Sequence, residues 1–92
     1  MELLNDNILV TELQDDLFVN GTAVVYDQDS PYMFCAVLGL SENAKQYFTN
    51  DNILVIKRYA KEEYLPGQYF ISLKDVRGKM SKEAYSKMCQ LD

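Results

Sequence analysis

The strongest constraint on the fold is a six-residue sequence that occurs twice, letter for letter, at residues 5–10 and 50–55. Each copy begins with Asn-Asp-Asn, whose short polar side chains hydrogen-bond to nearby backbone in turns, and ends with Ile-Leu-Val, which favours a pleated strand. The sequence therefore predicts two turns, each followed directly by a strand. Two copies are too few for a solenoid, so a chance repeat and a two-fold relation between strands both stay open.

Other segments extend this β-rich pattern. Residues 22–26 and 33–40 are apolar runs separated by residues 27–31, which favour a turn, so we expect a hairpin there. We also expect the second repeat to continue as a strand through Lys57, Arg58 and Tyr59, Pro66-Gly67 to form a turn, and residues 68–73 to form another strand. Five or six short strands at this spacing predict a small β-barrel.

The C-terminal stretch has a different periodicity. Ser81 can cap a helix in which apolar residues recur at helical spacing, namely Ala84, Tyr85, Met88 and Leu91. We therefore expect a mainly β fold with a short C-terminal helix. The 92 residues are one domain's worth of chain, with a barrel over residues 1–80 and a helix over residues 81–91.

Charge and cysteine content exclude several classes of function. The net charge of −5 disfavours nucleic-acid binding. The chain has no histidine, and Cys35 and Cys89 lie far apart, so we expect no metal site, no disulfide and no cofactor. The first residues lack a secretory leader pattern and no segment is long and apolar enough to span a membrane, so we expect a cytoplasmic location, in the host cytoplasm for a virus-encoded protein.

No group of residues points to catalysis. The paired acids Asp15-Asp16, Asp27-Asp29 and Glu62-Glu63 are expected to be solvated, because acids near turns usually are. Cys35 lies in the most apolar run and is expected to be a buried thiol rather than a nucleophile. We therefore expect a binding protein and not an enzyme.

Three segments, in order, resemble the GroES co-chaperonin family and together cover roughly residues 3–76. Residues 4–10 match the family's L-x-D-x-V-x-V opening. Residues 51–60 match its G-D-x-V-L-x-x-K-Y-A segment, with Asn50 in place of glycine. Residues 67–73, followed by Asp75 and Val76, are similar to its G-E-E-Y-L-I-L strand and the acidic and aliphatic residues after it.

The resemblance implies a GroES-like β-barrel that binds a chaperonin ring, assists protein folding and forms homo-oligomers. Family members dock on the ring through an apolar patch on a mobile loop between the first two strands, which corresponds here to residues 13–25. The candidate partner-binding residues are Leu17, Phe18, Val19, Ala23, Val24 and Val25. Ala23, Val24 and Val25 are the best match to the family's G-G-I-V-L segment. Residues 17–19 could instead be a buried strand, and the exposure of their side chains would decide between the two alternatives.

Three departures limit what the resemblance implies. Residues 40–49 are too few for the family's roof hairpin, and the helix over residues 81–91 has no counterpart in it. The family closes its ring by pairing the last strand of one subunit with the first strand of the next, but residues 76–80 contain Gly78 and two basic residues and are expected to be a poor strand. These departures favour a second hypothesis, a small viral structural or assembly adaptor with the same barrel and no chaperonin contact.

Overall fold

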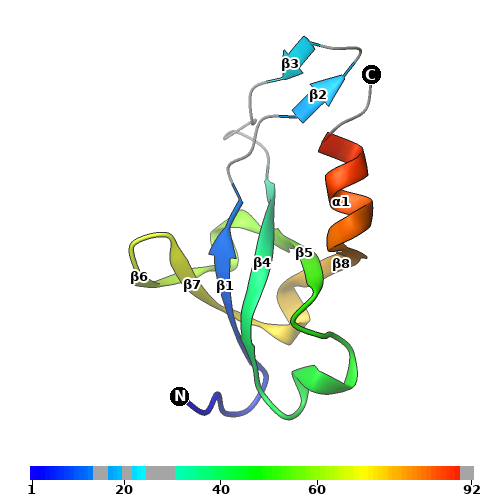
Figure 1. Ribbon diagram of the computed structural model, residues 1–92. Coiled ribbons are helices and arrows are strands. Elements are labelled where there is room, and N and C mark those ends of the chain that lie inside the picture. The colour runs from blue at the N-terminus through cyan, green and yellow to red at the C-terminus, as the bar shows by residue number, and fades with distance from the viewer. Residues whose placement is uncertain (14–16, 20–21, 25–30, 90–92) are drawn as a thin grey trace.

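The computed structural model describes residues 1–13, 17–19, 22–24 and 31–89, of which 17–19, 22–24 and 89 are described by their backbone alone. This part of the chain is mainly antiparallel β-sheet with one short C-terminal helix (Figure 1). A six-stranded sheet has the order β6-β7-β1-β4-β5-β8, and a separate two-stranded sheet pairs β2 with β3. The elements are β1 (Asn7–Glu12), β2 (Leu17–Val19), β3 (Thr22–Val24), β4 (Tyr32–Leu40), η1 (Ala44–Gln46), β5 (Asn52–Lys57), η2 (Arg58–Ala60), β6 (Glu62–Leu65), β7 (Gln68–Ser72), η3 (Leu73–Asp75), β8 (Val76–Ser81) and α1 (Lys82–Cys89).

The two copies of the repeated hexapeptide form the predicted turns and strands. The backbone N–H of Asn7 donates to the carbonyl of Leu4 over 3.2 Å, and the N–H of Asn52 donates to the carbonyl of Thr49 over 3.1 Å. The side chains of the same two asparagines complete the turns, with the Asn7 amide donating to Leu4 and the Asn52 carbonyl accepting from the Thr49 N–H. Asn5 lies in the left-handed region with φ 60°, which asparagine tolerates better than most residues.

The strands that follow these turns, β1 and β5, lie on either side of β4 and pair with it antiparallel. They direct opposite faces of the same hexapeptide toward the hydrophobic core. In β1 the core residues are Ile8 and Val10, whereas in β5 they are Leu54 and Ile56. Ile53 of β5 is also buried, because the other face of this strand lies against α1.

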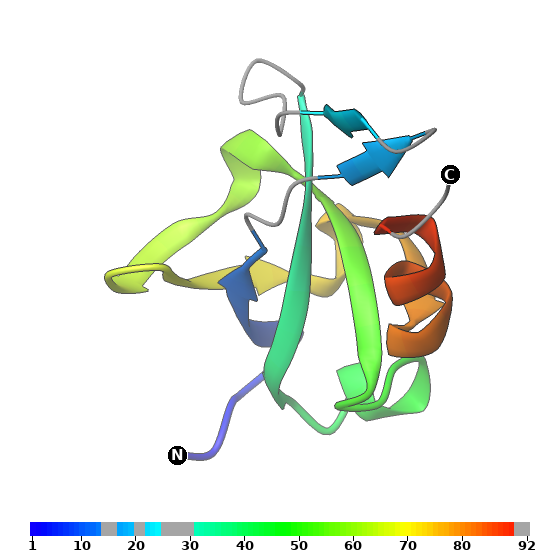
Figure 2. The ribbon, with the colours of Figure 1, turned by 45° about the horizontal axis from the view of Figure 1, so that its top comes forward.

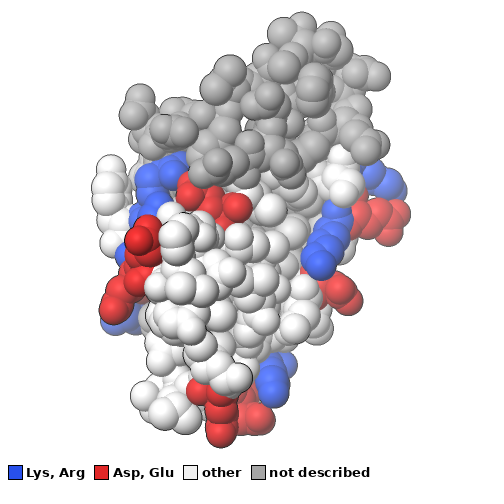
Figure 3. Space-filling view, turned by 60° about the vertical axis from the view of Figure 1, so that its left-hand side comes forward, with Lys and Arg blue, Asp and Glu red and all other residues white. Residues whose placement is uncertain are grey.

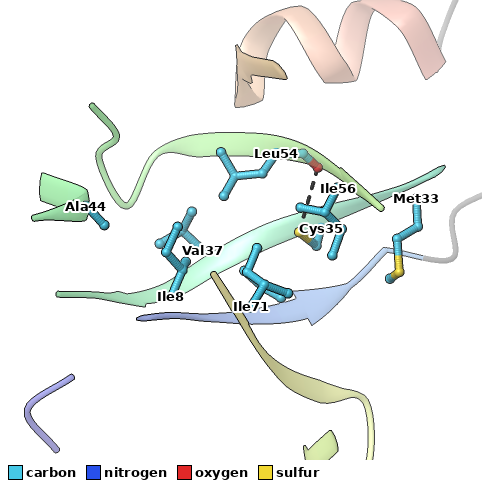
Figure 4. Close-up of a cluster of buried hydrophobic side chains, with 9 residues drawn as sticks. Ile8, Met33, Cys35, Val37, Ala44, Leu54, Ile56 and Ile71 are labelled. Atoms are coloured by element: carbon cyan, nitrogen blue, oxygen red, sulfur yellow. Dashed lines mark hydrogen bonds between the residues drawn. The ribbon is translucent and has the colours of Figure 1, made fainter. Parts of the chain in front are cut away.

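The core joins four strands of the large sheet. Figure 4 shows its side chains converging from β1, β4, β5 and β7, with Ala44 of η1 at one end. Cys35 is fully buried among them, as predicted, and its thiol donates to the carbonyl of Leu54 over 3.7 Å. From the apolar run at residues 33–40, the core takes the alternate residues Met33, Cys35 and Val37.

The expected closed barrel is not confirmed. The sheet ends at β6 on one side and at β8 on the other, and neither strand has a further strand beside it within the part of the chain that the structure describes. The predicted turn at Pro66-Gly67 is confirmed and joins β6 to β7, with Gly67 at φ 78°. The mainly β prediction therefore holds, and the sheet is open.

Three local predictions are wrong. The hairpin expected between residues 22–26 and 33–40 does not form, because both edges of β4 are taken by β1 and β5 and β3 pairs with β2 instead. The strand expected through Tyr59 ends at Lys57, where Arg58 begins a 3-10 turn and its N–H donates to the carbonyl of Pro31 over 2.8 Å. Residues 76–80, expected to be a poor strand, form most of β8, because pairing with β5 outweighs the low strand propensity of Gly78.

The C-terminal helix begins as predicted. The Oγ of Ser81 accepts a hydrogen bond of 3.0 Å from the N–H of Ala84, which is the expected N-cap. Tyr85 is buried and packs against the ring of Phe34 with 5.5 Å between centroids, so α1 covers the outer face of β4 and β5 (Figure 2). Among the described residues, no helix has the length and apolar character needed to cross a membrane.

Candidate protein-binding site

The residues proposed from the sequence for partner binding are brought together by the two-stranded sheet of β2 and β3. Its register pairs Leu17 with Val24, Phe18 with Ala23 and Val19 with Thr22. Five of the six predicted residues therefore lie in one β-hairpin, and Val25 lies outside the described residues. Residues 17–19 form a strand, and the burial that one alternative gave to this strand concerns side chains outside the described part of the structure.

The hairpin lies outside the six-stranded sheet and beside the C-terminal helix. In both ribbon views it is at the end of the molecule where β4 begins and α1 ends (Figures 1 and 2). Backbone contacts join β2 to α1. A two-stranded hairpin is marginally stable by itself, so contact with α1 supports this one.

Arg58 ties together the two chain segments that lead to and from the hairpin. Its Nη1 lies 3.5 Å from the Oε1 of Glu12, at the end of β1, and both side chains are largely buried, with 13% and 11% of their surface exposed. On the returning side, Arg58 donates from Nη2 to the carbonyl of Tyr32 over 3.1 Å and from its backbone N–H to Pro31. One residue therefore holds the base of the 19-residue connection between β1 and β4 at residues 13–31.

Tyr69 and Lys61 extend this polar group at the base of the hairpin. The Lys61 ammonium lies 4.8 Å from the ring centroid of Tyr69 and 3.7 Å from the sulfur of Met33. Burial raises the pKa of the Tyr69 hydroxyl, and the negative charges of Glu12 and Glu63 and a hydrogen bond to Glu12 raise this pKa further. Tyr69 is therefore a protonated donor near neutral pH, which suits a structural contact with the Glu12 carboxylate.

Sequence reasoning missed Arg58 and Glu12 as functional positions. Arg58 belongs to the Lys-Arg-Tyr-Ala segment that carries part of the GroES resemblance, yet this gave no reason to pair it with a residue 46 positions earlier in the chain. The sequence predicted a strand through Arg58 and carried no signal that this residue has a specific partner. The pairing itself depends on the sheet order.

The structure also describes some of the side chains that the sequence singled out as candidates for chemistry. Burial, and to a lesser extent the charge of Glu12, raise the pKa of the Cys35 thiol from 9.0 to about 12, so it is a poor nucleophile at neutral pH. Within the same residues no group of three or more His, Cys, Asp or Glu side chains could hold a metal ion. Of the acid pairs, Glu62 and Glu63 are exposed on β6, and the other two lie outside the described residues.

Comparisons of the chain with protein-family models, with curated proteins and with solved structures found no match.

Proposed function

We propose that this chain is a co-chaperonin-like protein that binds a chaperonin ring through the β2–β3 hairpin and assists protein folding. The observation that carries the proposal is the place of the hairpin. It is an apolar segment inserted between β1 and β4, outside the six-stranded sheet, where the GroES family has its docking loop. In this proposal the sheet, which encloses the core, is a GroES-like barrel left open between β6 and β8.

The physical basis of binding is the burial of apolar side chains in a groove of the partner. Each valine, leucine or phenylalanine that becomes fully buried stabilises a complex by about 1.5–3 kcal/mol before the cost of ordering is subtracted. The β2–β3 pairing and the Arg58 contacts at the base lower that ordering cost, because they fix the backbone before the partner arrives.

A specific observation favours the second candidate, a small viral structural or assembly adaptor with no chaperonin contact. The first strand of the family pairs with a neighbouring subunit, but here β1 is already bonded on both edges, to β7 over residues 7–11 and to β4 over residues 8–12. Ring closure of the family type therefore has no free edge on β1. A chain that cannot close such a ring would act as an adaptor.

A binding assay with a purified chaperonin ring, with and without nucleotide, separates the two candidates. Val24→Ser in the hairpin is expected to weaken binding to the ring by about tenfold or more, since one buried apolar contact is lost. Leu4→Ser is the matched control, because Leu4 has 63% of its surface exposed and lies outside the hairpin. Its binding should equal that of the unmodified chain.

A thermal melt of each variant accompanies the assay. If Val24→Ser binds as tightly as the control, the hairpin is not the docking site. If Val24→Ser loses several kcal/mol of stability together with binding, Val24 is a core residue and its docking role is contradicted. An unmodified chain that does not bind the ring in either nucleotide state contradicts the co-chaperonin function and leaves the adaptor function.

A further inference from the structure

The two edges of the large sheet lie on opposite sides of the molecule. In Figures 1 and 2, β6 is in the hairpin that projects on one side and β8 lies on the other, next to α1. An edge strand exposes unpaired backbone N–H and C=O groups and is a template for pairing with another chain. The described part of the chain therefore presents two such templates, and they face away from each other.

The edge at β8 borders a basic groove. A depression of about 560 Å³ is lined by four consecutive residues of β8, at positions 76–79, and by Tyr47, Phe48 and Leu73. Because successive side chains of a strand point to opposite faces, contact with four in a row places the groove along the strand's edge. Its charged lining residues are Arg77 and Lys79, both exposed.

The face of β8 is open at the centre of this groove. Gly78 has no side chain, and no atom lies within 4 Å of the position that a Cβ would take there. Lys79 donates from Nζ to the carbonyl of Tyr47 over 2.6 Å and lies 5.8 Å from the ring centroid of Phe48, so its positive charge is held at the groove's wall. The floor is apolar, since Phe48, Leu73 and Val76 pack against the core.

The edge at β6 has the complementary chemistry. All four of its residues are exposed, and their sequence is Glu62, Glu63, Tyr64 and Leu65. Tyr64 and Leu65 expose 44% and 47% of their surface, although the ring of Tyr64 also contacts Phe70. On this side of the molecule, Figure 3 shows charged side chains at the margins of a broad uncharged surface, an arrangement typical of interfaces with an apolar centre and a polar rim.

We propose that β6 of one copy of this chain pairs with β8 of the next, so that the protein assembles head to tail into a ring or a filament. The acidic half of β6 would meet Arg77 and Lys79, and its apolar half would enter the groove. An interface between two different surfaces of the same chain is heterologous, and it repeats until the rotation closes a ring or continues as a helix. The proposal does not depend on what the β2–β3 hairpin binds.

Charge favours the head-to-tail pair over the two symmetric alternatives. A β8–β8 pair centred on Gly78 would place Arg77 opposite Lys79, and like charges opposite each other destabilise strand pairs, whereas a β6–β6 pair would bring no opposite charges together. The head-to-tail pair alone brings opposite charges together. A second copy of this chain is therefore the occupant that the groove fits.

Charge reversal on each edge tests the pairing in the full chain. The β8 variant carries Arg77→Glu and Lys79→Glu, and the β6 variant carries Glu62→Lys and Glu63→Lys. Each variant alone should require a concentration about tenfold or more higher than the unmodified chain for half-maximal assembly, because both of its edges then carry the same sign. Lys74→Glu and Glu2→Lys make the same types of charge change at exposed positions outside both edges and should assemble normally.

Mixing the two variants gives the decisive result. The acidic β8 edge of one variant meets the basic β6 edge of the other, and the remaining edges are complementary as well, so equal amounts should restore assemblies of more than two chains in analytical ultracentrifugation. Single replacements, Arg77→Glu and Glu63→Lys, repeat the test if a double variant is not folded by circular dichroism. The proposal is overturned if the unmodified chain is monomeric up to high micromolar concentration, if assembly stops at a dimer, or if the folded variants do not complement each other.

Discussion

Replacing Arg58 with methionine removes the guanidinium that ties Glu12 to the returning chain at Tyr32, while it keeps most of the side chain's apolar volume. The carboxylate of Glu12, with 11% of its surface exposed, then loses its ion-pair partner. Breaking a buried ion pair by removing one partner costs about 3–5 kcal/mol. Because both side chains keep some contact with water, we expect the lower end, a loss of about 3 kcal/mol in the free energy of unfolding.

A second replacement isolates the contribution of the charge. In the double variant Arg58→Met/Glu12→Gln, the residue at position 12 has no charge to leave buried, so the double variant should be about 1 kcal/mol more stable than Arg58→Met alone. Lys45→Met is the control for losing an exposed ion pair. Lys45 and Glu42 lie 3.4 Å apart with 58% and 85% of their side chains exposed, and breaking such a pair costs about 0–1 kcal/mol.

Urea denaturation followed by circular dichroism gives the free energies of unfolding, and the chaperonin-binding assay is run on the same samples. A loss for Arg58→Met no larger than that for Lys45→Met would refute the role of Arg58 at the base of the hairpin. So would a double variant that is less stable than Arg58→Met by the full cost of Glu12→Gln, because additive losses mean that the two side chains do not interact.

Three further predictions concern stability. Burial raises the pKa of Cys35 in the folded chain to about 12 and also raises that of Tyr69, so the unfolded state loses these protons at lower pH than the folded state. The free energy of unfolding should therefore fall as the pH rises above about 9. Cys35→Ala should make this fall with pH less steep, and an unchanged pH dependence contradicts the burial of the thiol. Ser81→Ala should lower the stability by about 1 kcal/mol and reduce the helical signal in circular dichroism, since the cap to Ala84 is lost, and an unaltered melt would mean that the cap contributes nothing. Leu54→Ala should cost about 2–5 kcal/mol in urea denaturation, because Leu54 is fully buried in the core, whereas a loss below about 1 kcal/mol would place it at the surface.

What the sequence predicted correctly is mostly local. The turns before β1 and β5 depend on Asn7 and Asn52 bonding to residues three positions earlier, and the cap of α1 depends on Ser81 and a residue three positions later. The turn at Pro66-Gly67 needs only the backbone freedom of Gly67. These interactions lie within a few residues and leave a direct trace in the sequence.

The remaining features depend on which strands become neighbours. Of the identical hexapeptides, the first directs Ile8 and Val10 into the core, whereas the second directs Leu54 there and places Ile53 on the face that lies against α1. Residues 76–80 become a strand because they pair with the edge of β5. The strand propensity of Gly78 gives no indication of the stability that this pairing adds. For the candidate site, the sequence selected the apolar segments that form β2 and β3, but the residue that holds their base, Arg58, could be found only once β1, β4 and the end of β5 were seen together.

Amide hydrogen exchange of the full chain, with and without a chaperonin ring and nucleotide, tests the proposed function most directly. The amides of β2 and β3 should exchange faster than those of β1 and β4 in the free protein, because a two-stranded sheet outside the main sheet has few stabilising neighbours. On addition of the ring, the amides of residues 17–19 and 22–24 should gain protection while those of the β6–β7 hairpin stay unchanged. Protection that appears elsewhere, or no change at β2 and β3 when the ring is in excess, would contradict docking through the hairpin.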